Sequence, residues 1–188
     1  MIAPLSFSGP MRRTNNIFMI GPMGAGKTTI GRVLAKTLGV EFVDSDKEIE
    51  RRTGVSIPMI FEYEGEAGFR RREAEVLTDL AQSEGIVLAT GGGSILLPEN
   101  REALKAAGFV VYLHCPVNRQ LERIHKDSNR PLLQTENPRQ RLNDLFTVRE
   151  PLYRGLADTI VDSGQCASRS VVRQILRAYN RFNSRPAK

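Results

Sequence analysis

The sequence predicts a three-layer α/β/α fold with a central five-stranded parallel sheet, and three observations support this prediction. Short apolar runs alternate with segments of helical periodicity, which is typical of parallel sheets covered by helices on both faces. The first apolar run leads into a glycine-rich loop that a helical pattern follows directly. The length of 188 residues, with 40% hydrophobic and 26% charged residues, fits one globular domain.

The strands are identified as short apolar runs bounded by turn residues. The first, Asn16–Ile20, ends at a glycine, and Thr29–Leu38 then carries apolar residues at helical intervals, with Gly39 placed as a C-terminal cap. A second strand, Glu41–Val43, runs into Asp44. The remaining predicted strands are Ile86–Ala89, Val110–Leu113 and Thr159–Val161.

The remaining helices follow from periodicity and from the positions of proline. Pro116 suits a helix N-terminus, and Val117, Leu121 and Ile124 follow it on one face. Residues 126–138 are polar and bounded by proline, which predicts a loop. The other predicted helices are Asp46–Arg52, Pro58–Tyr63, Glu66–Ser83, Glu99–Ala106, Arg139–Arg149 and Ser170–Phe182.

The composition also indicates where the protein works. No apolar run approaches the ~20 residues that a membrane-spanning helix needs. In the first residues the charges Arg12 and Arg13 follow the weakly apolar part, which is the reverse of a signal peptide. Cys115 and Cys166 are too few for a disulfide framework or a four-cysteine zinc site. We therefore expect a cytoplasmic protein with no membrane partner.

The net charge of +6 could indicate an anionic partner such as nucleic acid. Arginines recur every four residues in the last predicted helix, as one solvated helix face requires. They are Arg173, Arg177, Arg181 and Arg185. We expect a solvated surface here and no nucleic-acid partner.

Residues Gly21–Thr28, GPMGAGKT, match the pattern G-x-x-x-x-G-K-[ST] between a predicted strand and a predicted helix. Glycines let backbone N–H groups approach phosphate oxygens, and the helix N-terminus adds partial positive charge. Lys27 can reach the outer phosphates and Thr28 can offer its hydroxyl to Mg²⁺. A glycine-rich turn with an exposed lysine is the alternative, but the flanking strand and helix favour a P-loop.

A P-loop alone does not separate kinases from other nucleotide-binding proteins. The chain lacks the N-K-x-D and D-x-x-G motifs of regulatory GTPases, and helicases and motor ATPases are usually larger. A small-molecule kinase is the remaining interpretation. Asp44 and Asp46 follow the second strand, where one carboxylate can serve Mg²⁺ and the other can orient an acceptor hydroxyl. Ser45 or Asp46 could equally cap the next helix.

With these residues identified, the sequence resembles the bacterial shikimate kinases over nearly its whole length. The matching segments are GPMGAGKTTIGR from Gly21, DSDKEIERRTG from Asp44, IFEYEGEAGFRRRE from Ile60, LATGGG from Leu88, RPLL from Arg130 and REPLY from Arg149. The resemblance implies transfer of the γ-phosphoryl group of ATP to the 3-hydroxyl of shikimate, a step of chorismate and aromatic amino acid biosynthesis. It also implies an NMP-kinase-like P-loop fold with substrate-binding helices, a mobile lid and a Mg²⁺ cofactor.

By this resemblance, the acceptor half of the site consists of residues from several segments. Asp46 is implied as the base or positioning group, while Arg70 and Arg149 would hold the substrate carboxylate. Gly91 and Gly92 would contact the substrate ring. Taken singly, Arg70 could be a helix-surface charge, the glycines a flexible turn and Arg149 a helix-end cation.

The donor half follows from the same resemblance. Arg123 and Gln165 would flank the adenine, and the lid at about residues 126–138 would deliver Arg130 to the phosphates. Thr90 occupies the position where many P-loop proteins have an aspartate, so Thr28 and Asp44 would hold the metal. The nucleotide-binding loop residues would be Gly24, Ala25, Gly26, Lys27, Thr28 and Thr29.

We expect residues 1–188 to form a single kinase domain that works as a monomer, with residues 1–14 as a flexible N-terminal extension. Two other functions stay open at this stage. A kinase of another small anionic metabolite such as gluconate would also combine a P-loop with an anion pocket. A regulatory or nucleic-acid-binding P-loop protein is the alternative from a different class.

Overall fold

The computed structural model describes residues 15–124 and 137–184 of the chain. Within this part, five parallel strands form one sheet in the order β2-β3-β1-β4-β5. The strands are β1 (Ile17–Ile20), β2 (Glu41–Asp44), β3 (Ile86–Ala89), β4 (Phe109–His114) and β5 (Thr159–Asp162). The five predicted strands are therefore confirmed, with ends that differ by no more than one residue.

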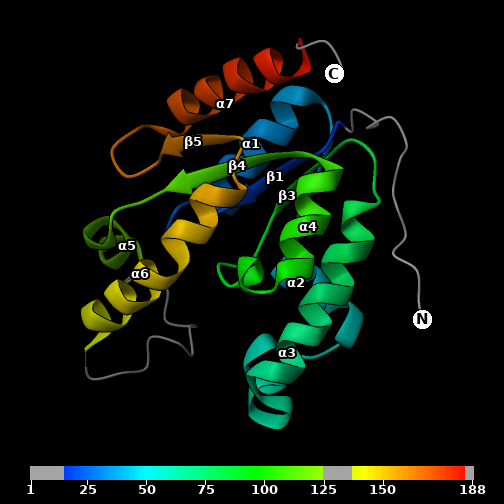
Figure 1. Ribbon diagram of the computed structural model, residues 1–188, viewed down its shortest axis with the longest axis vertical. Coiled ribbons are helices and arrows are strands. Elements are labelled where there is room, and N and C mark those ends of the chain that lie inside the picture. The colour runs from blue at the N-terminus through cyan, green and yellow to red at the C-terminus, as the bar shows by residue number, and fades with distance from the viewer. Residues whose placement is uncertain (1–14, 125–136, 185–188) are drawn as a thin grey trace, which may run out of the picture.

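Helices cover both faces of the sheet, which confirms the three-layer architecture. In Figure 1, α1 and α7 lie on one side of the sheet, and α3, α4 and α6 lie on the other. The helices are α1 (Lys27–Leu38), α2 (Ser45–Thr53), α3 (Ile57–Ala81), α4 (Pro98–Ala107), α5 (Val117–Ile124), α6 (Pro138–Leu156) and α7 (Ser168–Asn183), with a short 3₁₀ helix η1 (Ser94–Leu96).

The apolar strands contribute to two cores, one on each face of the sheet. In β1, Ile17 and Met19 pack into the cluster that contains residues of α1 and α7. Phe18 and Ile20 point the other way and pack with residues of α2, α3, α4 and α6. All four side chains are fully buried. Burial on both faces explains why this strand is a continuous apolar run rather than an alternating pattern.

Helix α3 contains both of the helices predicted for this stretch. Gly65 separates them with φ 68° and ψ −176°, a conformation outside the helical range. A glycine adopts such a positive φ at little cost, so the chain can change direction here between two helical segments. The second segment starts directly after this kink, as the periodicity from Glu66 predicts.

Helix α6 is longer than predicted. The sequence places its end at Arg149, before Pro151, but the helix continues through Pro151 to Leu156. Proline removes one helical hydrogen bond, which makes it a natural stop signal. Burial of Tyr153 and Leu156 in the core beyond the proline outweighs this loss, because these side chains pack only if the helix continues.

The strand order brings the loops of the site together. From β1 the chain passes to β2 at one edge of the sheet, and after β3 it crosses to β4 on the other side of β1. Ligands of open parallel sheets bind at such a switch point, beyond the carboxyl ends of the strands. The glycine-rich loop follows β1 at this position, between the loops that follow β3 and β4.

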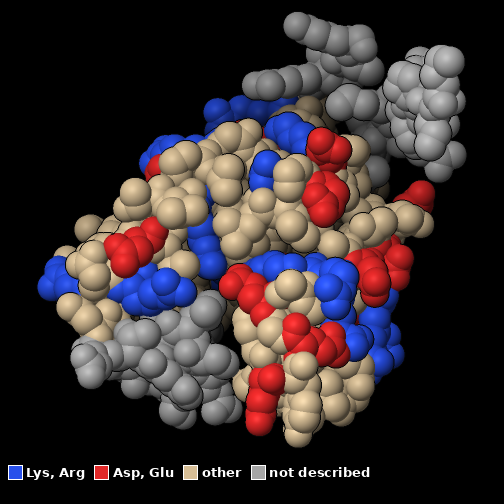
Figure 2. Space-filling view, turned by 60° about the horizontal axis from the view of Figure 1, so that its bottom comes forward, with Lys and Arg blue, Asp and Glu red and all other residues tan. Residues whose placement is uncertain are grey.

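Several expectations concern the surface or residues outside the described part. Arg173, Arg177 and Arg181 are exposed on α7, which confirms the solvated face for these three, while Arg185 is not described. On the face shown in Figure 2, acidic and basic side chains are interspersed. The expected N-terminal extension and nearly all of the lid, including Arg130, lie outside the described residues. None of the described helices is long and apolar enough to cross a membrane.

Candidate active site

The glycines of the phosphate loop have the backbone conformations that the motif requires. Gly21, Gly24 and Gly26 have φ values of 141°, 76° and 85°. A Cβ atom on Gly21 would also lie 2.6 Å from the carbonyl oxygen of Leu113, at the end of β4. Glycine is therefore needed at Gly21 both for its conformation and for the close approach of the neighbouring strand.

Lys27 begins α1 and reaches back over the loop. Its Nζ donates to the carbonyl oxygens of Gly21 at 2.7 Å and Pro22 at 2.9 Å. The ammonium group therefore lies above the loop, next to the start of α1, where the helix dipole favours negative charge. Thr28 and Thr29 are exposed in the first turn of the same helix. The structure thus places the predicted loop residues together at one helix N-terminus.

Asp44 connects the phosphate loop to α2. Its Oδ2 accepts a hydrogen bond from Thr28 Oγ1 at 2.8 Å, and its Oδ1 accepts one from the backbone N–H of Asp46 at 3.2 Å. Asp44 is therefore the N-cap of α2, a role that the sequence suggested for Ser45 or Asp46. Ser45 is instead buried, and its Oγ accepts a hydrogen bond from the N–H of Gly91 at 3.0 Å.

The carboxylate of Asp46 lies against the glycine segment that follows β3, residues 91–93. A Cβ atom on Gly91 would be 2.8 Å from Asp46 Oδ1 and 2.7 Å from Glu73 Oε1. Two acidic groups, one from α2 and one from α3, therefore face the same glycine. Burial raises the pKa of Glu73, against the opposing effect of Arg70, and the charge of Asp46 raises it further.

Arg70 is held in place by two glutamates of its own helix. Its Nη1 donates to Glu73 Oε2 at 2.5 Å, and its Nη2 donates to Glu66 Oε1 at 3.1 Å. Its side chain is only 12% exposed. A Cβ atom on Gly93 would lie 2.4 Å from Arg70 Nη2, so the guanidinium packs directly on the backbone there. Arg70 is not a surface charge, which excludes the alternative interpretation of this residue.

Burial opposes the charge of Arg70, but the two carboxylates outweigh this effect and raise its pKa above the usual value. The residue therefore stays cationic in a largely dehydrated place. A planar guanidinium fixed in this way presents two N–H groups in the geometry that matches a carboxylate. A mobile surface arginine would first have to lose side-chain freedom to reach the same geometry.

Arg149 lies on α6 and is buried. Because α6 continues to Leu156, Arg149 is in the middle of the helix, and the interpretation of it as a helix-end cation is wrong. It lines a cavity of about 250 Å³ together with Glu66 and Leu96, from α3 and η1. The charge of Arg149 also acts on Glu73, so both predicted carboxylate-binding arginines approach the same acidic group.

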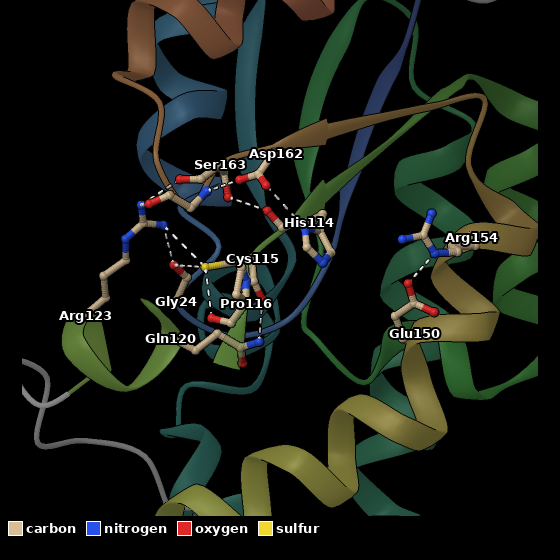
Figure 3. Close-up of polar contacts among 11 residues, drawn as sticks. Gly24, His114, Cys115, Pro116, Gln120, Arg123, Glu150, Arg154, Asp162 and Ser163 are labelled. Carbon is tan, nitrogen blue, oxygen red and sulfur yellow. Dashed lines mark hydrogen bonds and ion pairs between the residues drawn. The ribbon is translucent and has the colours of Figure 1, made fainter. Parts of the chain in front are cut away.

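Arg123 extends from α5 to the edge of the phosphate loop, as Figure 3 shows. Its Nη1 donates to the carbonyl oxygen of Gly24 at 2.9 Å, and its Nη2 donates to that of Ser163 at 2.6 Å. Gln165 is exposed two residues further on, in the loop between β5 and α7. The two residues predicted to flank the adenine are therefore close to one another in the structure, beside the phosphate loop.

Thr90 occupies the end of β3 without an acidic group. Its hydroxyl donates to the carbonyl oxygen of Met19 at 3.3 Å, and its N–H donates to the same oxygen at 3.1 Å. The side chain is buried and engaged with β1. It therefore has a structural role at the position where many P-loop proteins have an aspartate.

Sequence reasoning missed two buried residues of the site, Glu73 and Tyr153. Glu73 closes the segment IFEYEGEAGFRRRE and Tyr153 closes the segment REPLY, so both lay within stretches that carried the resemblance. A further signal for Glu73 was its position on the apolar face of α3, where a fully buried carboxylate needs a partner. Tyr153 was missed because the predicted helix ended at Arg149, before Pro151, whereas α6 continues and places Tyr153 one helical turn beyond Arg149.

A P-loop beside a cluster of two arginines and two carboxylates defines the chain as a P-loop kinase of the small-molecule class. More specifically, the chain belongs to the shikimate kinase family, whose model, described as shikimate kinase, matches residues 23–180. A shikimate kinase of Methylococcus capsulatus is 69% identical over 175 residues, which cover 93% of this chain and 98% of that protein. The recognition of the family and of an ATP-dependent kinase is confirmed.

Solved structures agree with this assignment. The structure described as "Shikimate kinase from Acinetobacter baumannii in complex with shikimate" matches with a TM-score of 0.88 and 52% identity, over 93% of this chain and 97% of that chain. A gluconokinase from Sinorhizobium meliloti matches with a TM-score of 0.50 and 20% identity, which shows a likeness of fold alone. The P-loop fold predicted from the sequence is thereby confirmed.

Proposed function

We propose that this protein transfers the γ-phosphoryl group of ATP to the 3-hydroxyl of shikimate, releasing shikimate 3-phosphate and ADP. The observation that carries the proposal is the contact between the two halves of the site at Gly92. A Cβ atom there would lie 3.5 Å from both the carbonyl oxygen of Gly21 and the backbone nitrogen of Met23. The glycine segment of the acceptor pocket thus adjoins the phosphate loop, as direct transfer between two bound substrates requires.

The acceptor pocket has the charges that a hydroxylated carboxylic acid needs. Arg149, which is buried, and Arg70, which is largely buried, supply two guanidinium groups for the carboxylate. Asp46, next to Gly91, supplies a carboxylate that can accept the proton of the attacking hydroxyl and align it. We propose that the two arginines fix the acid while Asp46 orients the hydroxyl toward the phosphate loop. Catalysis then consists of positioning and charge stabilisation.

Thr28 and Asp44 form a pair that fits Mg²⁺. A hydroxyl and a carboxylate oxygen lie 2.8 Å apart, and both are hard oxygen donors of the type that Mg²⁺ prefers. Among the described residues no group of three or more His, Cys, Asp or Glu side chains could hold a metal, so phosphate and water oxygens would complete the coordination. When bound, the ion neutralises charge on the transferring phosphoryl group.

We retain Arg130 and the lid at about residues 126–138 as part of the proposal, on the strength of the segment RPLL. An arginine on a closing loop adds charge to the phosphates only when the substrates are present and excludes water from the reaction. Asn137 and Pro138, at the end of this stretch, are already the cap and first residue of α6. These two residues of the predicted lid therefore belong to α6.

We also propose that the enzyme acts as a monomer in the cytoplasm. Among the described residues, the exposed large apolar side chains come from α1, the turn after α2, α3, α6, β5 and α7, which supports a monomer. They are Val33, Val55, Met59, Tyr63, Val148, Ile160 and Phe182. Cys115 and Cys166 are free thiols, as expected in a reducing compartment. Light scattering at micromolar concentration tests the monomer.

The function is tested by measuring ADP release with shikimate, gluconate, nucleoside monophosphates and RNA, each offered separately with ATP and Mg²⁺. We expect turnover with shikimate alone, and we expect it to stop when EDTA removes the metal. Turnover with gluconate but not shikimate would overturn the proposal in favour of another metabolite kinase. ADP release stimulated by RNA would instead indicate a nucleic-acid-dependent ATPase.

A further inference from the structure

Tyr153 joins the two sides of the acceptor pocket. It lies on α6, one helical turn after Arg149, and its side chain is fully buried. Its hydroxyl donates a hydrogen bond of 2.5 Å to the carbonyl oxygen of Gly92. Gly92 is the residue at which the acceptor pocket adjoins the phosphate loop. One side chain therefore links the helix of a carboxylate-binding arginine to the backbone between the two substrates.

The glycine segment needs such a link. Gly91, Gly92 and Gly93 have no side chains through which packing could fix their position, and glycine backbones have more conformational freedom than others. Two side chains from outside hold the segment by hydrogen bonds. Ser45 of α2 accepts from the N–H of Gly91 at 3.0 Å, and Tyr153 of α6 donates to the carbonyl oxygen of Gly92.

The environment of Tyr153 keeps its hydroxyl protonated. Burial raises the pKa of Tyr153 well above its usual value, while the charge of Arg149, a hydrogen bond with the Arg149 side chain and the charge of Arg70 oppose this effect only in part. A protonated phenol can donate its hydrogen bond to a carbonyl oxygen throughout the working pH range. The same two arginines are those proposed to bind the substrate carboxylate, which places Tyr153 directly behind the acceptor pocket.

A second tyrosine provides a matched control. Tyr112 of β4 stacks on Tyr153 with ring centroids 5.0 Å apart and an angle of 22° between the rings. It is equally buried, but within the described residues its hydroxyl has no hydrogen-bond partner. The stacked pair thus contains one hydroxyl that contacts the glycine segment and one that does not.

We propose that Tyr153 is a positioning residue for the acceptor: its hydroxyl holds the Gly91–Gly93 segment at the distance from Arg149 that the acid substrate requires. This inference rests on the proposed function of the site. It differs from a purely structural role, because the Tyr112 ring already shares the packing. Removing the Tyr153 hydroxyl should therefore weaken binding of the acceptor and leave the donor site and the fold intact.

The experiment compares Tyr153→Phe with Tyr112→Phe in the full chain. For Tyr153→Phe we expect the KM and the calorimetric Kd for shikimate to rise roughly three- to tenfold, which is the effect of one net hydrogen bond. The KM for ATP should stay close to that of the wild type, and the melting temperature should fall by only about 2–4 °C, because the carbonyl oxygen of Gly92 loses one buried donor. Tyr112→Phe should leave all four quantities unchanged, because its hydroxyl contributes no hydrogen bond.

Three outcomes decide the matter. An unchanged shikimate KM and Kd in Tyr153→Phe, or equal changes in the two variants, would overturn the inference while leaving the function of an active wild type untouched. If the wild type shows no turnover with shikimate, the proposed function itself is overturned. If Tyr153→Phe folds poorly, Ser45→Ala removes the other anchor of the segment, and wild-type shikimate affinity in that variant also counts against the proposal.

Discussion

The proposed donor and acceptor halves of this site meet at Gly92 but are built in different ways. The phosphate loop is one continuous segment, Gly21–Thr28, and its shape depends on positive φ values at three of its own glycines. The acceptor pocket draws on α2, α3, α6 and the segment after β3, with contacts such as that between Tyr153 and Gly92, which are 61 residues apart. One half is encoded locally and the other by the tertiary fold.

This difference has a consequence for substitution. A change in the phosphate loop acts on local backbone geometry and on the helix N-terminus, so it affects the nucleotide. A change in the proposed acceptor half alters a cluster in which the charges of Asp46, Arg70 and Arg149 all act on the carboxyl group of Glu73. Charges coupled in this way respond together, so acceptor variants should affect both catalysis and acid binding. Three substitutions test this separation and a fourth tests how α2 is held, in order from the largest expected effect to the smallest.

Replacement of Asp46 by asparagine should have the largest effect. The amide keeps the shape of the side chain but cannot accept the proton of the attacking hydroxyl, so kcat should fall roughly 10²- to 10⁴-fold. ATP affinity, measured by calorimetry, should be retained because Asp46 belongs to the acceptor half. Near-normal turnover would remove Asp46 from the mechanism, and loss of ATP binding would show that the two halves are not separable at this residue.

Arg70→Lys should weaken binding of shikimate more than binding of ATP. Lysine preserves the positive charge beside buried Glu73 but lacks the planar fork, so we expect the shikimate KM to rise roughly 10- to 100-fold. Steady-state kinetics with each substrate varied would show a KM for ATP within about twofold of the wild type. The control is Arg71→Lys, at the exposed neighbouring position. Equal kinetic effects in the two variants would contradict the role of Arg70.

Arg123→Ala tests the proposed donor half, where the expected effect is on ATP rather than on shikimate. Arg123 touches the carbonyl oxygens of Gly24 and Ser163, so its loss should loosen the loop that we propose to flank the adenine. We expect a rise of roughly three- to tenfold in the KM for ATP, with the shikimate KM unchanged. Glu122→Ala, at the exposed neighbouring position of the same helix, is the control. A larger effect on shikimate than on ATP would refute the division into halves.

The same difference between local and tertiary encoding decided what could be predicted from the sequence. The five strands and the phosphate loop were predicted from local patterns, since burial on both sheet faces and glycine conformations leave direct signals in the chain. The acceptor residues could be named only by resemblance, because no spacing along the chain shows that Asp46, Arg70 and Arg149 meet. The predicted end of α6 was wrong for a related reason. Pro151 is a local stop signal, but packing of Tyr153 and Leu156 beyond it outweighs the lost hydrogen bond.

Glu48 gives the smallest expected effect and tests how α2 is held. Its carboxylate accepts hydrogen bonds from Arg51 and Arg52, and Arg52 also reaches Asp79 of α3 at 2.5 Å. The hydrogen bonds from Arg51 and Arg52 lower the pKa of Glu48 from 4.5 to about 2. This cluster therefore joins the helix that carries Asp46 to the helix that carries Arg70.

The direction of the pH effect follows from the lowered pKa. The folded state favours the ionised carboxylate, so its contribution to stability is fully present above about pH 4.5 and is lost as the pH falls toward 2. Glu48→Gln should lower the melting temperature by no more than about 4 °C at pH 7, as expected for a solvated ion pair, and the gap should close toward pH 2. Thermal unfolding from pH 7 to pH 2 measures it, with exposed Glu102→Gln of α4 as the control. A gap independent of pH would mean that Glu48 acts by packing rather than by charge, and that the cluster does not hold α2 electrostatically.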